Sequence, residues 1–152
     1  MKSNIIKIEQ IKQLREETGV SIIECKKALV EAKGNLGKAK EILKKWGSQL
    51  AGKKIKRETK EGIIESYIHP GKKIGAMVEL DCESDFVARS EDFQRLAHEL
   101  CLQIAAMDPK KTSLMRQPWI RDETKTIRDL VQEYIAKLGE NIIIKRFIRY
   151  EL

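Results

Sequence analysis

The chain has 152 residues, of which 41% are hydrophobic and 35% charged, with a formal net charge of +7. This composition is typical of a globular protein with one core and a small appendage, and no apolar run approaches the roughly 18 residues of a membrane-spanning helix. Three cysteines without C-x-x-C spacing argue against a secreted disulfide framework or a zinc ribbon, and the N-terminus lacks the features of a signal or transit peptide, so we expect the chain to work where it is made.

Three short helices are predicted in residues 1–47, where apolar residues recur at helical spacing. The first helix should end at Gly19, because glycine readily adopts the left-handed conformation that follows many helices. Ser21 begins a Ser-x-x-Glu capping box that starts the second helix. Asn35 can cap the third helix, which we expect to end at Gly47.

A basic segment follows in residues 48–60, with five Lys or Arg residues, one acidic residue and few apolar residues. This composition predicts a solvated linker, either irregular or in part helical. Beyond it, two β-rich runs at 63–68 and 74–80 flank a turn that contains Pro70 and Gly71. Such a pattern indicates a β-hairpin.

Helical spacing returns in residues 84–107 and in 127–138, and the β-branched run 142–150 can form a third strand that pairs with the hairpin. The sequence therefore predicts an α+β protein in which helices cover an antiparallel three-stranded sheet. Its expected parts are a three-helix module, a basic linker and an α+β core, in residues 1–47, 48–60 and 61–152.

Acidic residues concentrate where the second strand is predicted to end. Residues 61–109 carry 10 acidic and 4 basic groups, and Glu79, Asp81, Glu83 and Asp85 occupy alternate positions. Paired carboxylates can act in acid–base catalysis or bind a hard cation, but an exposed strand face before a helix N-terminus also favours acidic residues. From the residues alone, the second interpretation is favoured over a metal-dependent or acid–base enzyme.

The basic linker could contact phosphates. A small adaptor could thus use its three-helix module and this linker to bind RNA or a ubiquitin-like partner. Aromatic residues make up only 5% of the chain and none lies among the linker lysines, so stacking on single strands has little support. We keep such an adaptor as the alternative function.

Three signatures follow one another along the chain. The first is LREETGVSIIECKKAL at 14–29, the second runs from Gly75 to Arg89, and the third combines LGENI at 138–142 with KRF at 145–147. Together they span nearly the whole chain, and in this order they resemble the elongation factor Ts family, the guanine nucleotide exchange factors of elongation factor Tu.

The resemblance implies that the N-terminal module has a ubiquitin-associated-like fold that contacts the GTPase domain of elongation factor Tu. The positions that match the family's contact residues are Leu14, Arg15, Ile22 and Ile23. The family often has methionine in place of the two isoleucines, and the exchange keeps the contact apolar.

The family's Thr-Asp-Phe-Val segment, which is associated with dislodging magnesium from the GTPase, matches Ser84, Asp85, Phe86 and Val87. Serine replaces threonine here but keeps a hydroxyl that can cap a helix, and Asp81 stands where Asn is usual. The resemblance implies that this segment inserts an aromatic wedge into elongation factor Tu bound to GDP, so that GDP leaves and GTP can reload. No catalytic residue, cofactor or metal site in the chain and no direct contact with nucleic acid are expected.

The chain departs from the family between Met107 and Leu114, where the family has some tens more residues that extend the core or support dimerisation. We therefore expect a monomer or a weak homodimer, in a 1:1 or 2:2 complex with elongation factor Tu. The stretch 113–122 is most similar to the cyanobacterial and plastid branch, which favours the plastid stroma, or otherwise the bacterial cytoplasm, as the place of action.

Overall fold

The N-terminal part of the chain consists of three helices, as predicted. In the computed structural model, which describes residues 5–152, these are α1 (Ile8–Thr18), α2 (Ile22–Glu31) and α3 (Leu36–Lys54). Their small core contains fully buried residues of all three helices, including Leu14 and Leu29.

Three predicted helix ends are confirmed, namely the end of the first helix and the starts of the second and third. Gly19 follows α1 with a left-handed φ of 69°. The side chain of Ser21 accepts a hydrogen bond from the N–H of Glu24, and the side chain of Asn35 accepts one from the N–H of Lys38. These caps satisfy N–H groups that have no partner within the helix.

The third helix is longer than the sequence predicts. α3 continues through Gly47 to Lys54, so the predicted end at Gly47 is wrong. Gly47 lies where α3 packs against α6 (Ile127–Leu138), and a Cβ at this position would lie 3.7 Å from the Cβ of Ala136, which is an ordinary van der Waals contact. The packing against α6 extends α3 past the glycine, and only residues 55–60 connect α3 to the first strand.

The sheet has three antiparallel strands in the order β1–β2–β5. Its bounds are β1 (Glu61–Ile68), β2 (Ile74–Cys82) and β5 (Ile143–Glu151), so the predicted hairpin and third strand are confirmed. Because side chains alternate between the two faces of a strand, Val78 of β2 is fully buried while its neighbour Met77 is exposed on the outer face.

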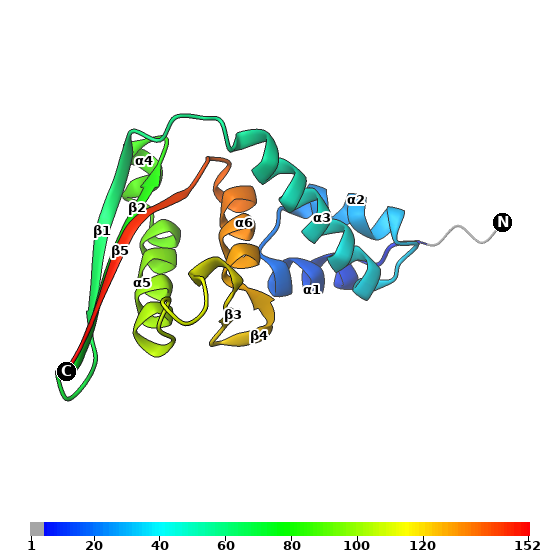
Figure 1. Cartoon of the computed structure of the whole chain (residues 1–152). Coiled ribbons are helices and arrows are strands. Elements are labelled where there is room, and N and C mark those ends of the chain that lie inside the picture. The colour runs from blue at the N-terminus through cyan, green and yellow to red at the C-terminus, as the bar shows by residue number, and fades with distance from the viewer. Residues whose placement is uncertain (1–4) are drawn as a thin grey trace.

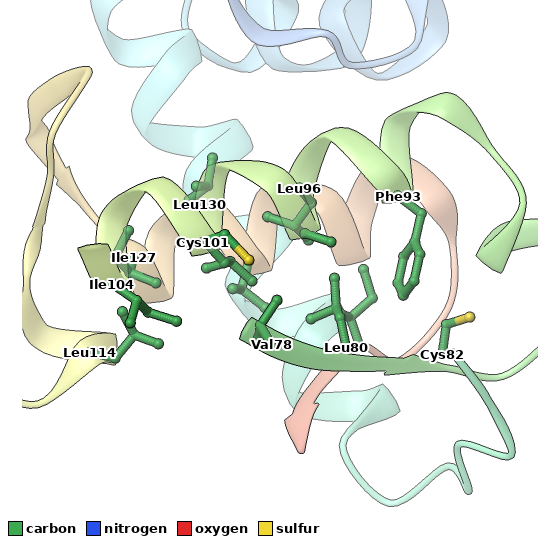
Figure 2. Close-up of a cluster of buried hydrophobic side chains, with 14 of the residues drawn as sticks. Val78, Leu80, Cys82, Phe93, Leu96, Cys101, Ile104, Leu114, Ile127 and Leu130 are labelled. Atoms are coloured by element: carbon green, nitrogen blue, oxygen red, sulfur yellow. The ribbon is translucent and has the colours of Figure 1, made fainter. Parts of the chain in front are cut away.

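Two helices follow the hairpin where the sequence predicts one helical region, namely α4 (Asp85–Ala88) and α5 (Glu91–Ala106). α5 covers the inner face of the sheet, and Figure 2 shows Leu80 of β2 near Phe93 of α5 and Val78 of β2 below Cys101 of α5. The side chains of Val78, Leu80 and Phe93 are fully buried, and each contributes about 1.5–3 kcal/mol by leaving water. The α+β fold class is confirmed.

The connection from α5 to α6 contains elements that the sequence does not predict. A 3-10 turn (Leu114–Arg116) precedes a small ribbon of β3 (Pro118–Trp119) and β4 (Asp122–Thr126). Leu114 is buried in the main core, near Ile104 in Figure 2. The short connection thus contributes to the core itself.

Two fully buried amide side chains hold this connection in place. Gln103 of α5 donates to the Oε1 of Gln117 at 3.0 Å, and its own Oε1 accepts from the N–H of Ile120 at 2.9 Å. Gln117 donates to the carbonyl oxygens of Thr112 at 2.9 Å and Met107 at 3.2 Å. Buried amides with these partners fix the path of the chain, since leaving one unpaired costs about 1–3 kcal/mol.

The elements form successive layers, which Figure 1 shows as the sheet, α5, α6 and then the three-helix module. Lys54 at the end of α3 donates to the carbonyl oxygen of Gly139 after α6, and Lys44 pairs with Asp129 of α6 at 3.4 Å. α3 therefore packs in the module and against the core, and the division at residues 47 and 60 stays a prediction.

Within residues 5–152, no helix combines the length and apolar character needed to cross a membrane.

Candidate partner-binding site

The segment from Ser84 to Val87 forms a single helical turn at the end of β2. The Oγ of Ser84 accepts a hydrogen bond from the N–H of Val87 at 3.3 Å and donates to the Oε2 of Glu140 at 2.6 Å. Val87 and Ala88 are buried in the main core. A helix of four residues has no stability of its own, so the cap and the buried residues hold the turn in place.

Phe86 points away from the protein, although the next two residues are buried. Its side chain is 79% exposed. Figure 1 places the turn, α4, at the end of the sheet opposite to the C-terminus. A large aromatic side chain exposed on a fixed turn can become an anchor buried in a partner.

Asp85 lies in the first turn of α4 and pairs with Arg89 at 3.1 Å. Both side chains are more than half exposed, and such a pair one helical turn apart contributes only about 0.3–0.5 kcal/mol. Asp85 can therefore exchange Arg89 for a group of a partner at little cost in stability.

Two residues after α6, to which the sequence assigns no role, contact this turn. Glu140 accepts the N–H of Ser84 at 2.9 Å and that of Glu83 at 3.1 Å, while Glu83 accepts the N–H of Asn141 at 2.8 Å. The only sequence signal for these contacts is the LGENI signature, in which a glycine that ends a helix is followed by an acid and an amide.

The cysteine of the same region is not a nucleophile. Burial, and after it the charge of Glu140, raise the pKa of the Cys82 thiol to about 11. Burial raises the pKa of Cys101 to about 12. Both thiols are protonated at neutral pH and unreactive.

Of the four alternating carboxylates, only Glu79 and Asp81 lie side by side, and the four do not converge on one point. Glu79 pairs with Arg146 on the outer face of the sheet, Asp85 pairs with Arg89, and Glu83 faces Asn141. Burial and then the neighbouring Glu79 raise the pKa of Asp81 above its usual range. Among residues 5–152, no three His, Cys, Asp or Glu side chains are grouped so that they could hold a metal ion.

The residues matched to the family's module contacts fall into two kinds. Ile22 and Ile23 at the start of α2 are 53% and 68% exposed, and Arg15 is also exposed. Leu14 is fully buried in the three-helix core, so its side chain supports this surface from within. Two adjacent exposed isoleucines form a small apolar surface that a partner could cover, and the same module exposes Arg15.

Comparison with known proteins identifies the family. The family profile described as Elongation factor TS matches residues 6–110 and 83–152. Elongation factor Ts of Coprothermobacter proteolyticus is 41% identical over 188 residues, with 93% of this chain and 95% of the relative covered. That of Solibacter usitatus is 40% identical, with 93% and 89% covered, and that of Thermotoga maritima is 40% identical, with 97% and 96% covered.

These alignments extend over 188 to 191 residues, whereas the chain has 152, so the relatives contain residues that this chain lacks. The profile nevertheless matches the chain from residue 6 to its end, including the α4 turn and the LGENI signature. The chain therefore belongs to the elongation factor Ts family of translation elongation factors.

Proposed function

We propose that the chain binds elongation factor Tu in its GDP form and promotes GDP release by inserting Phe86. The observation that carries this proposal is the contrast between the exposed Phe86 and the buried Val87 and Ala88 beside it. A fixed turn presents its aromatic ring without first having to fold, which lowers the entropic cost of binding.

Phe86 cannot supply the whole effect. To move a two-state site from about 1:99 to 99:1, a factor must bind one state roughly 5.5 kcal/mol more tightly than the other. Burial of one phenylalanine contributes about 1.5–3 kcal/mol. The remainder has to come from other contacts that are better in the nucleotide-free state, and the exposed surface of Arg15, Ile22 and Ile23 on the module is our candidate for additional binding.

Asp85 acts beside the wedge. GDP is held in a GTPase partly by a magnesium ion that bridges protein and phosphate oxygens. Insertion of Phe86 displaces the groups that order this ion, and Asp85, which gives up only the weak pair with Arg89, repels phosphate or captures a hydrogen bond of the partner. No residue of this chain forms or breaks a covalent bond in this scheme.

The complex is proposed as 1:1 or 2:2, with the chain as a monomer or weak homodimer and without direct contact to nucleic acid. The proposed place of action is the plastid stroma or the bacterial cytoplasm. An adaptor that binds RNA through the exposed lysines of residues 53–60 predicts binding that weakens steeply with salt. Salt-tolerant binding to elongation factor Tu, without affinity for generic RNA, supports the exchange factor instead.

The test is release of fluorescent GDP from elongation factor Tu by the parent chain and by Phe86→Ala. Loss of about 1.5–3 kcal/mol predicts release that is about 10 to 150 times slower. Ile120→Ala is the control, because it removes an exposed apolar side chain far from α4 along the sequence. If Phe86→Ala releases GDP as fast as Ile120→Ala and both are folded, the wedge is not the mechanism.

A further inference from the structure

Glu140 holds the turn that carries Phe86 through three hydrogen bonds. Its Oε1 accepts the N–H groups of Ser84 at 2.9 Å and of Glu83 at 3.1 Å, and its Oε2 accepts the hydroxyl of Ser84 at 2.6 Å. Since β2 ends at Cys82, both N–H groups lie beyond the last strand pair of the β1–β2 hairpin. The carboxylate thus replaces the sheet as the acceptor for this turn, and hydrogen bonds to a charged group are the stronger kind.

A second carboxylate, from the strand end, accepts a hydrogen bond from the chain after α6. Glu83 accepts the N–H of Asn141 at 2.8 Å, while the amide of Asn141, which is 2% exposed, donates to the carbonyl oxygen of Arg57 at 2.9 Å. The guanidinium of Arg57 lies 3.7 Å from Glu83. The strand end, the chain after α6 and the connection from α3 are therefore joined at one point.

This arrangement determines where Phe86 lies. Ser84 caps the four-residue α4, and Phe86, the second residue of this helix, lies two residues after Ser84. A turn this short depends on its cap for its orientation, and the cap residue is itself held by Glu140. Displacement of a functional group by about 1 Å can reduce a rate by about 100-fold.

We propose that Glu140 is a positioning residue for nucleotide exchange, which orients Phe86 through Ser84 without touching the GTPase. This inference rests on the proposed role of Phe86. It also explains why an acid directly follows the glycine that ends α6, because Gly139 with φ of 76° turns the chain toward the β2 end.

The experiment compares Glu140→Ala, Glu140→Gln and Glu140→Asp with the matched control Glu133→Ala, which removes a glutamate of α6 paired with Lys125. The maximal rate of GDP release and the concentration for half-maximal release are measured separately. Glu140→Ala should lower the maximal rate about tenfold, or about 1.4 kcal/mol, with less than about a twofold change in half-maximal concentration. A general loss of folded protein would instead leave the maximal rate unchanged and raise the apparent half-maximal concentration.

The conservative variants separate positioning from simple packing. Glutamine keeps an oxygen that can accept the two N–H groups, so Glu140→Gln should stay within about threefold of the parent. Aspartate keeps the charge but is one methylene too short, so Glu140→Asp should resemble Glu140→Ala. If Glu140→Ala does not fold, Glu140→Asp is measured in its place.

A double variant identifies the route of the effect. If Glu140 acts through Phe86, Phe86→Ala with Glu140→Ala should be no slower than Phe86→Ala alone. The positioning role is overturned if the double variant loses as much release rate as the product of the two single losses. It is also overturned if Glu140→Ala and Glu140→Asp both keep the full maximal rate while Phe86→Ala still impairs release. Failure of the proposed function is a different result, in which Phe86→Ala itself releases GDP at the parent rate.

Discussion

Replacing Ile22 and Ile23 together by alanine tests the module surface. A fully buried isoleucine contributes about 1.5–3 kcal/mol, and 53% and 68% of these side chains remain exposed in the free chain. Docking can therefore add about 1–2 kcal/mol from each, and because alanine keeps the Cβ of each residue, the double variant should lose about 2–3 kcal/mol of binding. This corresponds to an affinity for nucleotide-free elongation factor Tu that is about 30 to 150 times weaker, measured by titration calorimetry.

The double variant should also fold and melt like the parent, because neither side chain is part of a core. Leu14→Ala provides the contrast, since Leu14 is fully buried and its truncation should cost about 2–5 kcal/mol of folding stability. Val30→Ala, at the other end of α2 and 58% exposed, is the control for binding. Affinity equal to that of Val30→Ala, or a melting temperature as low as that of Leu14→Ala, would refute the assignment of Ile22 and Ile23 to the contact surface.

Three further expectations concern stability and reactivity. Gln117→Ala should reduce the free energy of unfolding in urea by about 1–3 kcal/mol, because Gln103 and two carbonyl groups lose a buried partner; an unchanged midpoint would contradict this. Burial and Glu79 raise the pKa of Asp81, so its ionised form destabilises the fold. Asp81→Asn should therefore add less than about 1 kcal/mol at pH 7, and this gain should decline as the pH falls below the raised pKa and vanish once the carboxyl is protonated in both the folded and the unfolded chain. The buried Cys25, Cys82 and Cys101 should not react with a thiol reagent at pH 7 until the chain is unfolded, whereas rapid labelling of the native chain would show that a thiol is accessible.

The sequence predicts the fold well where local signals and long-range packing agree. Gly19, Ser21 and Asn35 mark helix ends in the structure because each has the backbone or side-chain chemistry that the end requires. Gly47 has the same identity as Gly19 but lies within α3, which continues past it where the helix meets Ala136 of α6 across 89 positions of sequence. No local pattern reports such a contact.

The candidate site is predicted only in part for a similar reason. The family resemblance assigns Ser84 and Phe86 to the segment that acts on the GTPase. In the structure Ser84 caps the turn, whereas Phe86 is exposed on its surface. The contact between Ser84 and Glu140 joins residues 56 positions apart, so spacing along the chain cannot reveal it. Exposure likewise separates Leu14 from Ile22, although the resemblance assigns both to the same contact.

The activity proposed for this chain is the acceleration of nucleotide release from elongation factor Tu. Fluorescent GDP bound to elongation factor Tu is chased with excess unlabelled GDP, in the presence and absence of the parent chain. We predict release that accelerates with chain concentration to a plateau, and by linkage a chain that binds the GDP-loaded GTPase more weakly than the empty one. A release rate that is the same with and without the folded chain would rule out this activity.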